Sequence, residues 1–174
     1  MKKSTILLIL VLIMILSGCK FGNSVPDEPV NFYYPWADLE STMKQNPQCT
    51  AIGSEEHDIS GNRNSLSYVL SLYFLGPQDS TLVSPFPQNT SVLSIQNEEG
   101  LLTLELSTNF AQLKGIDLTV ACTCLAKTCF DLTGAESVLI QSAIDDPEIA
   151  VNFTLNRGNL LLSDARQETI PTTE

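Results

Sequence analysis

The sequence is poor in basic side chains. Nine Lys and Arg residues stand against 20 Asp and Glu residues, which gives a formal net charge of −11 over 174 residues. Nucleic-acid binding relies on clustered Lys and Arg that contact phosphates, so this composition argues against a nucleic-acid partner. The acidic residues form no long run of like charge, which is typical of a solvated acidic surface rather than an acidic tail.

The sequence also lacks the short motifs that accompany common active sites. It contains no G-x-S-x-G, G-x-G-x-x-G, P-loop or H-E-x-x-H pattern. Its one histidine, His57, lies in the acidic stretch EEHD, which is more typical of a solvated loop than of half a metal site. An enzyme needs a nucleophile with a base, or a cluster of metal ligands. We therefore expect a non-catalytic protein without a cofactor or metal ion.

No apolar run is long enough to cross a membrane. The longest, residues 6–16, has eleven residues, whereas a membrane-spanning helix needs about 20. Lys2 and Lys3 precede this run, as in the n-region of an export signal. The small residues Ser17 and Gly18 then lead into Cys19.

This ending resembles the bacterial lipobox, in which the cysteine thiol receives a diacylglycerol and the chain is cut just before it. We therefore predict a signal peptide over residues 1–18, lipidation of Cys19, and attachment to the extracytoplasmic face of the bacterial cell membrane. An ordinary secretory signal with an incidental cysteine is the alternative. Since the chain is acidic and anionic lipid surfaces repel it, acyl chains would supply the whole attachment.

The remaining chain has the composition of one globular domain. Hydrophobic residues make up 43% of the sequence, enough for a single sizeable core. Residues 19–29 contain Gly and two prolines without an apolar period and are predicted to be a linker. The domain is predicted to span residues 30–164, and the polar residues 165–174 to form a flexible tail.

Hydrophobic periodicity predicts alternating strands and helices. Residues 36–62 have no clean period and are predicted to be a long loop with a short strand or turn near Ile52. The predicted elements are a strand at 30–34, a helix at 64–75 ended by Gly76-Pro77, a hairpin at 91–107, a helix from Asn109 or Lys114-Gly115 to Leu132, a strand at 138–141, and a hairpin of 151–155 with 160–162. This order predicts an α+β fold, with a β-α-β-β-α-β core, a C-terminal hairpin, and two helices on one face of a small mixed or antiparallel sheet.

Three stretches resemble the GerMN domain of spore germination and sporulation lipoproteins. They are PVNFYYP, the long segment from YVLSLYFLGP to LTLELSTNF, and GAESVLIQS, and together they lie within residues 29–142. The chain departs from the family in the stretch GSEEHD, which has no Arg, in its cysteine-rich second helix, and in the segment from Ile144 onward. The resemblance implies a membrane-anchored, non-catalytic module, similar in shape to ring-building domains. Its partners would be envelope or sporulation-complex proteins, or further copies of this chain.

Cysteines cluster in the second predicted helix. Cys122 and Cys129 fall on one apolar stripe with Leu118, Leu125 and Leu132 and are expected to be buried as small hydrophobes. Cys124 lies about 120° from that stripe and is expected to be partly exposed. The three thiols cannot converge on one metal ion from a single helix. A disulfide between Cys49 and Cys124 remains an alternative to free thiols, because export permits such a bridge.

Two strands have consecutive apolar residues, 138–140 and 160–162. Strands with one wet face normally alternate, so this pattern predicts that both faces are covered. Since the helices cover one face, we expect the other to meet the folded-back hairpin or a partner, with Leu139 and Leu161 in the interface.

Two other functions are compatible with the sequence. The first is a module that binds a small ligand or glycan, using Tyr33, Tyr34 and Trp36 as a stacking platform. The second is a hydrolase that uses carboxylates of the acidic loops.

Overall fold

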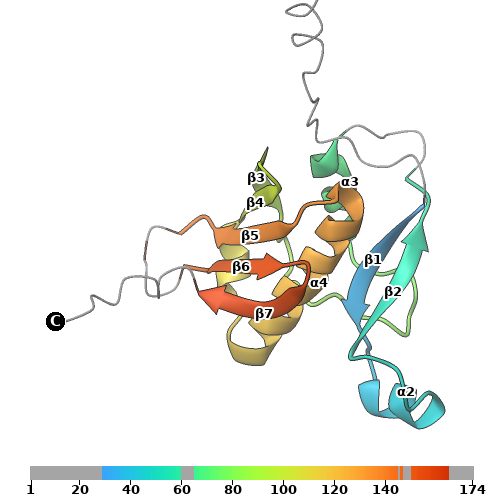
Figure 1. Ribbon diagram of the computed structural model, residues 1–174. Coiled ribbons are helices and arrows are strands. Elements are labelled where there is room, and N and C mark those ends of the chain that lie inside the picture. Colours follow the sequence, from blue (N-terminus) through green and yellow to red (C-terminus); the bar gives the residue numbers. More distant parts are fainter. Residues whose placement is uncertain (1–28, 60–64, 145, 147–149, 165–174) are drawn as a thin grey trace, which may run out of the picture.

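The computed structural model describes residues 29–59, 65–144, 146 and 150–164, and Figure 1 shows their arrangement. The predicted signal peptide, Cys19 and the predicted tail lie outside these residues. The elements are β1 (Val30–Pro35), α2 (Leu39–Gln45), β2 (Ile52–His57), α3 (Leu66–Tyr73), β3 (Val92–Glu98), β4 (Leu101–Leu106), the 3-10 helix η1 (Thr108–Gln112), α4 (Gly115–Thr133), β5 (Ser137–Ser142), β6 (Asn152–Asn156) and β7 (Asn159–Asp164).

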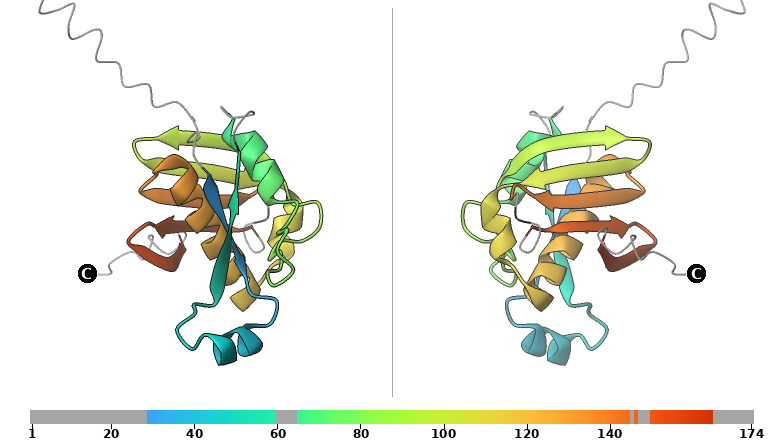
Figure 2. Two further views of the ribbon diagram at one scale, coloured as in Figure 1. Left: turned by 90° about the vertical axis from the view of Figure 1, so that its right-hand side faces the viewer. Right: turned by 90° about the vertical axis from the view of Figure 1, so that its left-hand side faces the viewer.

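The strands form two sheets, so the predicted α+β class is confirmed. One sheet has five strands in the order β3-β4-β5-β6-β7, and the other is the ribbon of β1 and β2. Within the larger sheet β4 and β5 are parallel and the other neighbours are antiparallel. The parallel pair requires a crossover connection, which η1 and α4 supply. Helix α4 lies between the five-stranded sheet and the ribbon, as the two views of Figure 2 show.

Helix α4 is the centre of the core. Its end agrees with the sequence prediction, because Gly134 adopts the left-handed conformation (φ 68°) that ends many helices. Cys122 and Cys129 are fully buried, as predicted. Cys124 is fully buried as well, so its predicted partial exposure was wrong. The periodicity argument assumed one covered face, whereas α4 is packed on two sides.

The ribbon meets α4 through the free edge of β1. The backbone N–H of Tyr33 donates to Oγ1 of the buried Thr128 (3.1 Å), and the Tyr33 carbonyl accepts from the Tyr73 hydroxyl of α3 (2.8 Å). Tyr34 in turn donates its hydroxyl to the Tyr73 carbonyl (2.7 Å). Since an unpaired strand edge invites other strands, these bonds close the exposed edge of β1 and join α3, α4 and β1.

Helix α2 was not predicted, because it has no buried residue and therefore no apolar period. Local interactions hold it instead. Asp38 caps its first turn by accepting from the Ser41 N–H (2.9 Å), and Glu40 pairs with Lys44 across one turn (2.7 Å). Strand β2, where only a short strand or turn was expected near Ile52, extends over six residues as the partner of β1. No helix among the described residues is both long and apolar enough to cross a membrane.

Candidate interaction surface

The hairpin of β3 and β4 places one strand at the edge of the larger sheet. Its two-residue turn has positive φ at both Glu99 (50°) and Gly100 (85°), which is the signature of a type I′ turn. In such a hairpin the flanking pair, Glu98 and Leu101, exchanges both backbone hydrogen bonds, and every second residue then points its N–H outward. The outward-facing N–H groups of β3 therefore belong to Ile95 and Asn97.

This outer edge of β3 is open within the described part of the chain. Strand β4 is the only strand that pairs with β3 there, and no hydrogen bond from a described side chain or loop reaches the outward backbone groups. A bulge at Leu93 interrupts the ladder, and the Leu93 side chain is 56% exposed. Because of this bulge Val92, and not Leu93, takes the position opposite Leu106.

A groove separates this edge strand from α3. It consists of two adjoining hollows, of about 220 and 280 Å³, which share Ser67 of α3 and Val92 of β3 as lining residues. Leu93 lines the first hollow, and Leu75, which is 83% exposed, lines the second. Tyr68, on the same helix, is 41% exposed. Exposed apolar side chains beside an unpaired strand are features of sites that accept an added strand.

The sequence also predicts an interface at Leu139 and Leu161, on the face of the sheet away from the helices. Buried and partly exposed residues alternate along β5, with Val138 and Ile140 inside and Leu139 outside. The neighbours of Leu139 on β4 and β6 are Thr103 and Thr154, so polar side chains flank it on both sides. In β5, therefore, the consecutive apolar residues 138–140 do not mark two covered faces. The side chain of Leu161 lies outside the described residues.

The three aromatic residues proposed as a stacking platform each make contacts within the fold, and Tyr33 and Trp36 remain partly exposed. Tyr34 is fully buried. Tyr33 donates its hydroxyl to Asp131 (2.7 Å), and burial, followed by this contact, raises the pKa of Tyr33 to about 12. Trp36 donates to the Thr50 carbonyl (2.8 Å), and its ring lies so close to Gly53 that a Cβ there would be 2.6 Å away. With Tyr34 buried, the three rings do not form one open platform.

The acidic stretch after β1 is part of a strand, not a loop. Glu55 accepts from the backbone N–H groups of Gln78 and Asp79 and lies 2.6 Å from Nε2 of His57. Burial raises the pKa of Glu55, but these hydrogen bonds outweigh it and leave the pKa below its usual value. His57 also stacks on Phe32, with ring centroids 4.3 Å apart. The pair thus fixes the 78–79 loop against β2.

The four described cysteines are free thiols, so the Cys49–Cys124 bridge considered from the sequence is not formed. Cys49 is partly exposed, while Cys124 is fully buried near Tyr34 and Tyr73. Burial raises the pKa of Cys122 and of Cys124 to about 12, and that of Cys129 further. These thiols therefore remain protonated and behave as apolar core groups. No group of three or more metal-ligating side chains comes together among the described residues.

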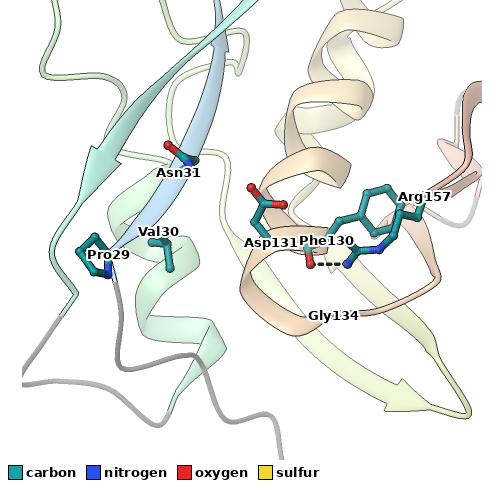
Figure 3. A pocket seen from close by; sticks show the side chains of 7 residues that line it. All are labelled: Pro29, Val30, Asn31, Phe130, Asp131, Gly134 and Arg157. Carbon is teal, nitrogen blue, oxygen red and sulfur yellow. Dashed lines mark hydrogen bonds between the residues drawn. The ribbon is translucent and has the colours of Figure 1, made fainter.

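A further hollow of about 540 Å³ lies beside the end of α4, where Val30 and Asn31 face Asp131 and Arg157 (Figure 3). Arg157 donates through Nη2 to the carbonyl of Phe130 and through Nε to that of Ala135 (3.0 Å), with its guanidinium over the Phe130 ring. A cation at the carbonyl end of a helix is stabilising. The two charged side chains of this hollow therefore have structural partners. Asp131 accepts from the Tyr33 hydroxyl of β1, and Arg157 donates to carbonyls at the end of α4.

The geometry defines an α+β domain in which a central helix is held between a five-stranded sheet and a two-stranded ribbon, with the β3 edge of the sheet unpaired in the described part of the chain. The chain belongs to the Germane family, described as sporulation and spore germination, whose model matches residues 31–146. This confirms the resemblance found in the sequence. No curated protein and no solved structure matches the chain.

Proposed function

We propose that the chain is a lipid-anchored, extracytoplasmic protein whose domain binds other envelope proteins during sporulation or spore germination, without catalytic activity. Membership of the Germane family supports the biological process. The observation that carries the binding role is the unpaired edge of β3 beside the groove to α3. An added strand would bond to the outward backbone groups of Ile95 and Asn97, and its side chains would meet Leu93 and Leu75.

The charge of the hairpin favours a neutral or basic partner segment. Glu98 and Glu99 lie at the hairpin tip, and Glu105 lies on β4 opposite Ser94. None of the four described Lys and Arg residues lies on β3 or β4. An acidic segment would be repelled at this edge, so the partner's strand is expected to be uncharged or to carry Lys or Arg.

The described titratable groups support a non-catalytic role. The three thiols of α4 are buried with raised pKa values, and Glu55 and His57 are bound to each other and to the 78–79 loop. A nucleophile or base needs access to a substrate and a pKa suited to proton transfer.

The binding role is tested with Asn97→Pro and a matched Asn97→Thr variant. Proline removes an outward N–H and leaves the ladder to β4 intact, because Asn97 and Leu102 form a pair that does not exchange hydrogen bonds. Threonine changes the same side chain and keeps the N–H. We expect Asn97→Pro to lose the partner from detergent-solubilised envelopes and Asn97→Thr to retain it. Equal retention by both variants would contradict strand addition at β3.

The anchor is tested by Cys19→Ala, with Cys49→Ala as the control. If the Cys19 thiol carries the lipid, Cys19→Ala abolishes incorporation of labelled fatty acid and partitioning into the detergent phase, and Cys49→Ala preserves both. A Cys19→Ala protein that still carries labelled lipid would contradict the proposed anchor.

A further inference from the structure

The outer face of the five-stranded sheet is the side that points away from α4. The right-hand view of Figure 2 shows the sheet from this side, with the β1–β2 ribbon behind it. Strand alternation and register give its described side chains. They are Ser94, Gln96 and Glu98 of β3, Leu101, Thr103 and Glu105 of β4, Ser137, Leu139 and Gln141 of β5, and Asn152, Thr154 and Asn156 of β6.

This outer face is unusually uncharged for a surface of so acidic a protein. Glu98 and Glu105 are its only described charged residues, and eight others carry hydroxyl or amide groups. Solvated surfaces normally use Lys, Arg, Glu and Asp. The absence of any described cation on this face also means that an anionic ligand would find no counter-charge here.

Several hydrogen-bonding groups of the outer face have no partner side chain. Ser94 bonds to Glu105 (3.0 Å) and Ser137 to Asn156 (2.6 Å). The other polar side chains make no side-chain hydrogen bond to a described residue; they are Gln96, Thr103, Gln141, Asn152 and Thr154. A face of this kind can form many hydrogen bonds with a ligand that carries hydroxyl groups.

One row of side chains across the outer face brings several of these hydrogen-bonding groups together. The register aligns Ser94, Glu105, Gln141 and Asn152 side by side across four strands, which is a span of about 14 Å at 4.8 Å per strand. The last three line a hollow of about 370 Å³, whose wall also includes Val151. Oδ1 of Asn152 is buried and accepts no hydrogen bond within the described structure. Leaving a buried acceptor in this state costs free energy, which a donor group of a ligand would recover.

We propose that this row is the centre of a binding site for a neutral, hydroxyl-rich oligosaccharide. Sugar hydroxyls would donate to Glu105 and, after a small rotation of the amide, to Oδ1 of Asn152, while the Gln141 amide would both donate and accept. Leu139, in the adjacent row, offers an apolar spot for the C–H face of a sugar ring. The hollow at this row shares no lining residue with the groove beside β3, and the proposal does not rest on strand addition.

The test is a titration of the full chain in detergent micelles with chitotetraose, a neutral oligosaccharide, followed by calorimetry and by the NMR signals of the Gln and Asn side-chain amides. We expect binding at millimolar concentration or below, with shifts in the amide signals of Gln141 and Asn152. Gln141→Ala and Asn152→Ala should each weaken binding about tenfold. Gln112→Ala, at an exposed position on η1, should leave it unchanged.

Two further ligands separate the alternatives. An oligogalacturonate, which is anionic, should bind much more weakly than chitotetraose. Tetralysine should not displace bound chitotetraose. The proposal is overturned if chitotetraose produces no heat and no amide shifts, if its binding is insensitive to both variants, or if tetralysine binds the same residues more tightly. The last result would identify the outer face as a site for a basic peptide. If Asn152→Ala fails to fold, Gln141→Ala and the amide shifts of the native chain still decide the outcome.

Discussion

Replacing Thr128 by valine tests how the ribbon is attached to the rest of the fold. The two side chains have nearly the same shape, so the substitution removes the Oγ1 acceptor without opening a cavity. The Tyr33 N–H, 3.1 Å from that oxygen, then lies in a partly buried position without a partner. Leaving such a donor unsatisfied costs about 1–3 kcal/mol, a large share of the about 5–15 kcal/mol that stabilises a typical domain.

The measurement is urea unfolding followed by circular dichroism. With an m value of about 2 kcal/mol/M, a loss of about 2 kcal/mol lowers the midpoint by about 1 M and leaves m unchanged. The control is Thr119→Val on the exposed side of the same helix, where the hydroxyl bonds only to the Gly115 carbonyl of its own helix (3.1 Å). That variant should change stability by less than about 0.5 kcal/mol. Equal midpoints for the two variants would show that Thr128 does not hold β1.

Three further predictions follow from the buried groups. In the native protein Cys49 should react with a thiol reagent, whereas Cys124 and Cys129 should react only after unfolding, because burial raises the pKa of each. Cys124→Ser should destabilise the domain by about 1–3 kcal/mol, the cost of a buried hydroxyl without a partner; a negligible loss would mean that Cys124 is exposed. The pKa of Glu55 is lower in the folded than in the unfolded chain, so its stabilising effect is complete above the ordinary carboxyl pKa and is lost as the pH falls through the folded-state pKa. Glu55→Gln should therefore flatten the acid limb of the stability curve, and an unchanged limb would contradict the role of Glu55.

Local signals in the sequence were sufficient for most elements. The predicted start of α3 and the predicted end of α4 lie within two residues of the observed ones, because Ser65 caps α3 and Gly134 ends α4, and capping depends on residues within one turn of the helix end. The β3–β4 and β6–β7 hairpins also lie where the sequence predicted them, because short turns separate their strands. Periodicity correctly identified Cys122 and Cys129 as buried.

The errors concern contacts between distant segments. The burial of Cys124 depends on β1, about 90 residues earlier in the chain, packing on a second side of α4, and no local pattern reports that contact. The polar neighbours of Leu139, Thr103 and Thr154, likewise follow from the strand register, which the sequence of β5 alone does not report. The open edge of β3 follows from the strand order, which a hairpin sequence alone does not determine.

The most direct test of the proposed binding role is site-specific photo-cross-linking in the intact envelope. A photo-reactive amino acid replaces Leu93 at the β3 edge or, as the control, Thr119 on the exposed side of α4. The account predicts that position 93 cross-links to one envelope protein during sporulation or germination, that position 119 does not, and that adding Asn97→Pro abolishes the product. The same product from both positions, or a product that persists with Asn97→Pro, would contradict binding at the β3 edge.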